Sequence, residues 1–176
     1  VVAAAIRQAK SHDEELALIE SQLQDVTQII CDIYSRYLFE SMVLENREKQ
    51  FMNAETLCGM MLKAQEQSYG DGLDAGFRHP YMWVCKSHYY GSTFYNYPYA
   101  FGGLFARGLY AQYEREGAAF VPKYKKLLRT TTVATAEDVA QVAGIDLTDK
   151  EFWRSALQTV AQQIDLVCGL LEEGKQ

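Results

Sequence analysis

The amino-acid sequence predicts an all-α fold in which residues 1–176 form a single helical domain. Apolar residues recur at spacings of three and four in several long segments, as they do on the buried face of a helix. Residues that favour helix N-termini precede these segments. No segment of six or more residues alternates apolar and polar side chains as a half-buried strand would. The 176 residues are enough for one sizeable core, and no change in composition marks a second domain.

The first long helix is predicted over residues 12–48, after residues 1–10, which have the composition of a helix end. Ser11 and Glu14 have capping-box spacing, in which the hydroxyl accepts from the N3 amide and the carboxylate from the N-cap amide. Glu40 interrupts the apolar series of this helix. A shift of the buried stripe is our preferred interpretation, over a functional buried acid. The series and its shifted continuation comprise Leu16, Ile19, Leu23, Val26, Ile30, Ile33 and Tyr37, then Phe39, Met42 and Val43.

Five further helices are predicted along the rest of the chain. They run from Asn53 to Gly70, over 100–116, near 118–129, from Thr135 to Gly144, and from Thr148 to about Glu172. Asn53 and Thr135 are suitable N-caps, and Thr148 with Glu151 has the spacing of a second capping box. The helix over 100–116 contains small residues, which predict that another backbone packs closely against it. These are Gly102, Gly103, Ala106 and Gly108.

Composition and charge argue against several classes of function. A net charge of −6 argues against a general nucleic-acid-binding surface. No apolar run reaches the roughly 18 residues of a membrane span. The first residues lack the features of a signal peptide and do not begin with Met, so we expect the chain to be a piece of a longer one. A solvated basic helix face is expected at Lys123, Lys125, Lys126 and Arg129, and reduced, partly buried thiols at Cys31, Cys58, Cys85 and Cys168.

A tyrosine-rich segment between His79 and Tyr113 is the candidate functional surface. It contains eight of the twelve tyrosines and two of the three histidines. Within it, His88 has Tyr89, Tyr90 and Tyr95 nearby in sequence. Phenol O–H and imidazole N–H groups directed at one point can bind a peptide carbonyl and stabilise the oxyanion that forms when water attacks. From the residues alone, an aromatic core layer with solvent-facing hydroxyls is the slightly preferred alternative.

The start of the helix that follows decides how the tyrosines are arranged. If the helix already includes Tyr95, then Tyr95 and Tyr99 share one face. If Asn96 is the N-cap, Tyr95, Tyr97 and Tyr99 surround a helix N-terminus, whose dipole favours negative charge. Both arrangements allow the oxyanion role. No complete catalytic motif is present, because HExxH, GxSxG, P-loop and dinucleotide-binding signatures are all missing.

Several blocks resemble the C-terminal part of oligoendopeptidase F, a family of the thimet-oligopeptidase-like M3 zinc metallopeptidases. The first is His88-Tyr-Tyr-Gly-Ser-Thr-Phe-Tyr-Asn-Tyr-Pro-Tyr-Ala-Phe-Gly with the helix after it. The segment Asp32-Ile-Tyr-Ser-Arg-Tyr-Leu-Phe-Glu40 resembles the long helix that follows the family's zinc site. Residues 135–147 and the helix after Thr148 resemble the end of the family's chain. The resemblance therefore covers nearly the whole sequence.

The resemblance implies a part of a cytoplasmic zinc endopeptidase that hydrolyses short peptides. It implies His88, Tyr95 and Tyr99 as catalytic residues that stabilise the tetrahedral intermediate, with Tyr97 as an exchange for one of the tyrosines. Substrate-binding residues are expected at Tyr89, Tyr90 and Tyr97. The zinc ligands and the general-base glutamate of HExxH would lie outside this chain, and no metal role is transferred to Glu14, Glu15, Glu20 or Glu40. The chain alone is therefore expected to bind no catalytic zinc and to cleave no peptide.

An alternative hypothesis is a non-catalytic helical module that binds a peptide or a protein. It fits the chain as it stands, because every complete catalytic motif is missing. Under the peptidase hypothesis, the missing part of the enzyme would leave apolar surface uncovered. We expect such a surface to favour self-association.

Overall fold

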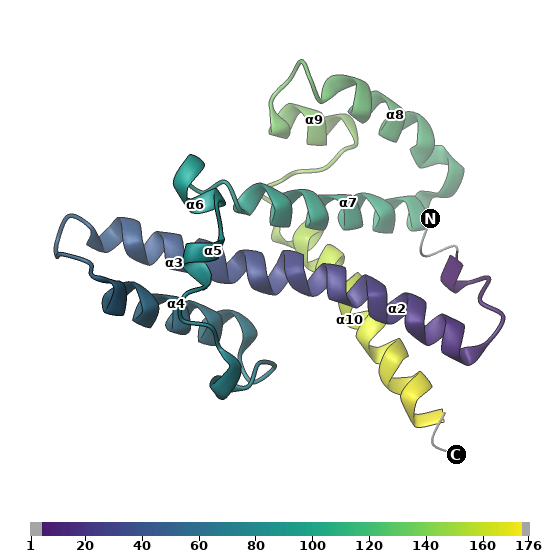
Figure 1. Cartoon of the computed structure of the whole chain (residues 1–176). Helices are drawn as coiled ribbons and strands as arrows, with labels where there is room; N and C mark the ends of the chain where they lie inside the picture. The colour runs from purple at the N-terminus through teal and green to yellow at the C-terminus, as the bar shows by residue number, and fades with distance from the viewer. Residues whose placement is uncertain (1–4, 174–176) are drawn as a thin grey trace. The chain divides into compact units, whose positions relative to one another are not determined.

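The computed structural model describes residues 5–173, and all regular structure within this range is helical (Figure 1). The predicted all-α class is confirmed. The chain divides into two compact units, Gln24–Phe101 and Val1–Leu23 with Gly102–Gln176, which we call the central unit and the terminal unit. The single domain expected from the sequence stays a prediction. Residues 1–4 of the predicted first helix end lie outside the described residues, and only residues 5 and 6 of the remainder are helical.

The central unit contains the end of α2 (His12–Thr27), a π-helical turn η1 (Gln28–Asp32), α3 (Ile33–Asn46), α4 (Ala54–Tyr69), a 3₁₀ turn η2 (Ala75–Phe77), and the short helices α5 (Met82–Cys85) and α6 (His88–Gly91). Helices α3 and α4 lie side by side (Figure 1). Phe39, Met61 and Ala64 form the buried centre of their contact. Asn53 caps α4 as predicted, since its Oδ1 accepts from the Thr56 amide at 2.8 Å.

The π-helical turn changes the register of the predicted long helix. A π turn adds one residue to a helical turn and so rotates the buried stripe. Ile33 and Phe39 are buried after it, whereas Tyr37, which the simple series places inside, is 43% exposed. The predicted shift to Phe39 is confirmed. Glu40 is nevertheless buried as well, at 7% exposure, so the stripe contains an acid.

The terminal unit contains most of α2 and α7 (Tyr97–Glu116), a 3₁₀ turn η3 (Gly117–Ala119), α8 (Phe120–Thr130), α9 (Ala136–Val142) and α10 (Lys150–Glu173). Its core is an apolar cluster formed by Leu109, Phe120, Leu127, Val139, Ala140, Ala143 and Ile145. The Thr135 cap is confirmed, because its Oγ1 accepts from the Asp138 amide at 3.2 Å. The basic residues of α8 are exposed, as predicted.

Two capping-box expectations are wrong in detail. Glu14 accepts from the amide of Lys10 at 2.8 Å, not from that of Ser11, although Ser11 does accept from the Glu14 amide. The cap of α10 is Asp149, whose Oδ1 accepts from the Glu151 amide at 2.9 Å, while Thr148 donates to Asp146. Side chains of this length can satisfy a helix N-terminus from neighbouring positions, so the sequence motif does not fix the partner.

The cysteines and small residues also differ from expectation. Cys31 and Cys58 are half-buried, as predicted, but Cys85 and Cys168 are exposed. Gly108 faces the ring of Phe152 and not another backbone, and Gly102 has open space where a Cβ would point. No helix among the described residues is long and apolar enough to cross a membrane.

Candidate functional site

The predicted site residues lie on α6, on the turn after it and on the first turn of α7. Helix α7 begins at Tyr97, immediately after Asn96, as in the second of the two arrangements considered from the sequence. The amide of Tyr99 donates to the carbonyl oxygen of Asn96 at 3.2 Å. Tyr95 therefore precedes the helix and Tyr99 lies within its first turn, so both are close to the positive end of the helix dipole.

Three predicted catalytic side chains meet in one group of rings, which we call the aromatic triad: His88, Tyr95 and Tyr99. The His88 ring is stacked on Tyr95, with ring centroids 5.4 Å apart and 23° between the planes. The Tyr99 ring meets both edge-on, at 5.9 Å from His88 and 5.8 Å from Tyr95. Such offset and edge-to-face contacts are favourable geometries for aromatic rings. The triad thus brings one imidazole and two phenols to one place.

The two phenols of the triad are accessible to solvent, and they interact with each other. Tyr95 and Tyr99 are 49% and 46% exposed. A hydrogen-bonding interaction with Tyr95 is the main reason that the pKa of Tyr99 lies above its ordinary value. His88 turns a buried Nδ1 inward, and this atom has no hydrogen-bond partner among the described residues.

The three predicted substrate-binding tyrosines occupy different environments. Tyr89 packs edge-on against Phe39 at 5.2 Å in the apolar centre of the unit, and burial raises the pKa of its hydroxyl. Tyr90 is 66% exposed and donates to the carbonyl oxygen of Trp83 at 3.1 Å. Tyr97 is exposed on the first turn of α7. Their substrate-binding roles stay predictions, and Tyr89 has the surroundings of a core residue.

Helix α3 contributes buried polar residues that sequence reasoning did not place at the site. Arg36 donates from Nη1 to Oδ1 of Asn96 at 3.2 Å and forms an ion pair with Asp32, the last residue of the π turn. Glu40 accepts through Oε1 from the amide of Phe94 at 2.6 Å. In the sequence, Glu40 interrupts the apolar stripe of this helix. A charged residue at a core position was the one available signal of this contact.

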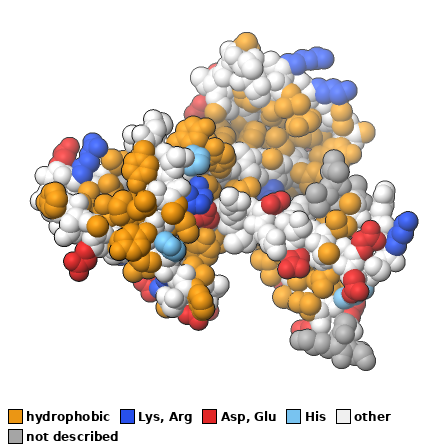
Figure 2. Space-filling view, in the orientation of Figure 1, with side chains coloured by type: hydrophobic (Ala, Val, Ile, Leu, Met, Phe, Trp, Pro, Cys, Tyr) orange, Lys and Arg blue, Asp and Glu red, His pale blue; other side chains and the backbone are white. Residues whose placement is uncertain are grey.

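A pocket of about 310 Å³ adjoins the triad within the central unit. Its lining combines two triad members, Arg36 and the π turn: Gln28, Ile29, Ile33, Arg36, His88 and Tyr99. Figure 2 shows histidine side chains among hydrophobic ones on the visible face of the unit that contains α3 to α6. A π turn is uncommon in helices and often occurs at functional sites. The pocket places open space directly beside the donors of the triad.

The chain shows sequence similarity to a bacterial oligopeptidase. Over 130 residues it is 27% identical to "Oligopeptidase PepF" of Bacillus subtilis (strain 168), which covers 74% of this chain and 19% of that protein. The chain is similar to a peptidase. It spans about a fifth of the length of this curated relative. No family model and no solved structure matches the chain.

The described residues do not supply a metal site. No group of three or more histidine, cysteine, aspartate or glutamate side chains in residues 5–173 is arranged to hold a metal ion. A catalytic zinc ion normally needs three protein ligands and an open position. The residues present therefore do not fit the zinc centre that the sequence resemblance implies, and such a centre would need ligands from elsewhere.

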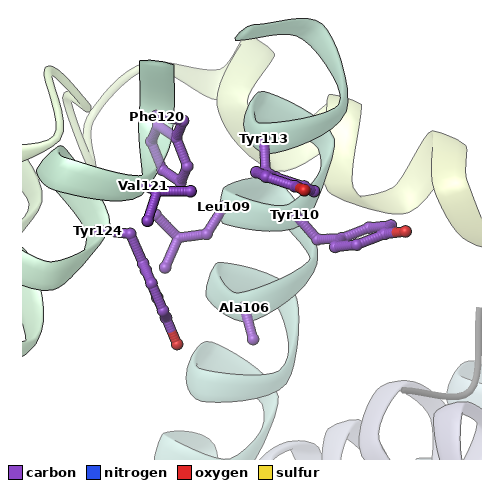
Figure 3. Close-up of a pocket in the computed structure, with 7 residues that line it drawn as sticks. All are labelled: Ala106, Leu109, Tyr110, Tyr113, Phe120, Val121 and Tyr124. Carbon is purple, nitrogen blue, oxygen red and sulfur yellow. The ribbon is translucent and has the colours of Figure 1, made fainter. Parts of the chain in front are cut away.

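A second pocket, of about 450 Å³, lies between α7 and α8 in the terminal unit (Figure 3). Its walls are almost entirely apolar or aromatic: Ala106, Leu109, Tyr110, Tyr113, Phe120, Val121 and Tyr124. Phe120 and Leu109 are buried, whereas the three tyrosines are partly exposed. None of the predicted site residues lines this pocket.

Proposed function

We propose that this chain is part of a cytoplasmic peptidase that hydrolyses short peptides, in which the aromatic triad stabilises the oxyanion of the tetrahedral intermediate. The observation that carries the proposal is the meeting of His88, Tyr95 and Tyr99 beside an open pocket. The similarity to an oligopeptidase supports the reaction class. The function belongs to a longer protein, because the chain spans only 19% of that relative.

The chemistry of the triad follows from its donors. When water attacks a scissile carbonyl, negative charge develops on the carbonyl oxygen. Hydroxyl protons of Tyr95 and Tyr99 and an imidazole N–H of His88 can donate to that oxygen. Donors that are already oriented stabilise the transition state more than the ground state, because they need no reorganisation during the reaction. The nearby N-terminus of α7 adds a favourable dipole.

Water activation would come from residues outside this chain. The sequence resemblance implies zinc for that role, with ligands elsewhere in the longer protein. In this proposal the chain would supply oxyanion donors and one wall of a substrate channel. Its described residues contain no group of side chains arranged as metal ligands. The chain alone is therefore expected to be inactive towards peptides.

The test is the turnover of the longer protein with Tyr95→Phe and Tyr99→Phe. Each loss of an oxyanion donor is expected to lower kcat by about 10²–10³-fold with little change in KM. Tyr34→Phe is the matched control, because Tyr34 is a comparably exposed tyrosine of α3, at 48%, outside the triad. Unchanged kcat in both triad variants would refute the catalytic role.

A second candidate is a helical module that binds a peptide or a protein. The apolar pocket between α7 and α8 favours it, because apolar walls with a few tyrosine hydroxyls are typical of binding sites (Figure 3). Sequencing the natural gene upstream of this segment separates the two candidates. A HExxH motif there supports the peptidase, and its absence from the whole protein supports the binding module.

A further inference from the structure

We propose that Arg36 and Glu40 are positioning residues that hold the turn 94–96 and thereby set the place of Tyr95 in the triad. We call this pair the α3 clamp. The inference rests on the proposed function for its consequence in catalysis. The structural part of the inference is that the clamp fixes the ring of Tyr95 against His88. This part depends only on contacts within the central unit.

The clamp holds the chain on both sides of Tyr95. Residue 94 is held through its backbone, since the Phe94 amide donates to Glu40 Oε1 at 2.6 Å. Residue 96 is held through its side chain, since Asn96 Oδ1 accepts from Arg36 Nη1 at 3.2 Å. Arg36 and Glu40 are four residues apart on α3 and therefore share a helix face. Tyr95, between the two anchored residues, remains half-exposed.

Burial makes these contacts strong constraints. Arg36 is 4% exposed, Glu40 7% and Asn96 1%. Charged and polar groups are rarely buried to this degree without a partner, because losing a buried hydrogen bond leaves an unpaired group out of water. Arg36 is itself held by its ion pair with Asp32. The clamp is thus connected to the π turn that also lines the pocket beside the triad.

The turn has a conformation that needs such support. Phe94 has a φ of 53°, in the left-handed region that non-glycine residues rarely adopt. Residues in this region persist where their surroundings over-determine the backbone, and they are frequent at functional sites. Here the Glu40 carboxylate holds the Phe94 amide, and the Phe94 ring packs against Tyr37 at a centroid distance of 5.4 Å. The left-handed residue turns the chain so that Tyr95 reaches the His88 ring.

The first experiment uses NMR of the chain and needs no reaction. The stacked Tyr95 ring is expected to shift the His88 ring protons, and the Phe94 amide to exchange slowly with solvent. Glu40→Met removes the acceptor, so the shift of the His88 ring protons and the slow exchange of the Phe94 amide are both expected to disappear. Glu40→Gln retains an acceptor oxygen and is expected to keep both. Glu45→Met, at an exposed position of α3, is the matched control and should keep both.

The second experiment measures kcat and KM of the longer protein with the same substitutions. Misplacing an oriented donor by about 1 Å can cost on the order of 10²-fold in rate. Glu40→Met is expected to lower kcat to that extent with little change in KM, and to add little to Tyr95→Phe in the double variant. Glu40→Gln should restore most of the turnover. A purely structural role would not give this rescue and this non-additivity together.

The outcomes separate the clamp from the proposed function. A Phe94 amide that exchanges like an open loop in the unsubstituted chain would overturn the clamp, whether or not Glu40→Met folds. Unchanged His88 signals in a folded Glu40→Met chain would also overturn it. If the His88 signals respond to Glu40→Met but Tyr95→Phe leaves kcat unchanged, the clamp is supported and the proposed catalytic role is refuted.

Discussion

At the scale of the residue, the site combines exposed donors with buried supports. Tyr95 and Tyr99 could be selected from the sequence because a motif pointed to them, and the structure places both against His88. The buried residues that hold them in place could not be identified from the sequence in the same way. Arg36 lies in an ordinary helical pattern, and only the fold shows that it is buried against Asn96. Glu40 interrupts the apolar series in the sequence, but a shift of the buried stripe is the preferred explanation of that interruption.

The surroundings of Tyr69 predict how the stability of the folded chain changes with pH. Burial, followed by the nearby Asp32 and Cys31 side chains, raises its pKa from 10.0 to about 12. An unfolded chain therefore releases this proton before the folded one does. The Tyr69 contribution to stability is fully present below about pH 10 and falls as the pH rises towards 12. The free energy of unfolding in urea, measured across this pH range, should fall more steeply in the unsubstituted chain than in Tyr69→Phe. An equal fall in the two chains would contradict the raised pKa of Tyr69.

At the scale of the element, residue chemistry predicted where most helices begin but not every irregularity within them. Asn53 and Thr135 cap helices as expected, because their short polar side chains reach a free amide of the first turn. The π turn at Gln28–Asp32 was not predicted, since the 3-4 apolar spacing continues through it. The four-residue helices α5 and α6 were also missed, because such short segments contain no periodicity.

Two glycines of α7 are expected to respond in opposite ways to alanine. A Cβ at Gly108 would lie 2.5 Å from Cε2 of Phe152 and closer still to its Cζ. The Phe152 ring cannot easily move, because it packs against Phe105 and Trp153. Gly108→Ala should therefore destabilise the chain by about 1–3 kcal/mol. Gly102→Ala meets open space and should stabilise it by about 1 kcal/mol.

The measurement for the glycine pair is the free energy of unfolding in urea. Gly102 is the matched control for Gly108, because both lie inside the same helix. If both substitutions change the free energy of unfolding equally, helix propensity alone explains the two changes. That result would contradict the close approach of Phe152 to Gly108.

At the scale of the whole molecule, the helical class was predictable but the division into two units was not. Periodicity identifies helices wherever an apolar stripe is buried. It does not say which stripes share a core. Tyr37 and Tyr34 of α3 are 43% and 48% exposed although they lie on a helix with a largely apolar sequence. Periodicity alone therefore does not predict which side chains of α3 another element covers.

Self-association is the expected behaviour of the chain by itself. Large hydrophobic side chains are exposed in both units, and extended apolar surfaces favour association in water. They include Tyr34, Tyr37, Phe51, Phe77, Tyr81, Val84, Tyr90, Tyr95, Tyr97 and Tyr99. Light scattering should show a mass that rises with concentration. A constant mass of 20.0 kDa at high concentration would contradict this expectation.

The most direct test of the central claim compares two ligands of the longer protein. One is a peptide analogue in which a tetrahedral phosphinate replaces the scissile amide, and the other is the unreactive product peptide. If the triad stabilises the oxyanion, Tyr95→Phe and Tyr99→Phe should weaken the phosphinate in proportion to their loss of kcat/KM and leave the product's affinity nearly unchanged. Tyr34→Phe should change neither. Phosphinate binding that is unaffected by both triad substitutions would contradict the account.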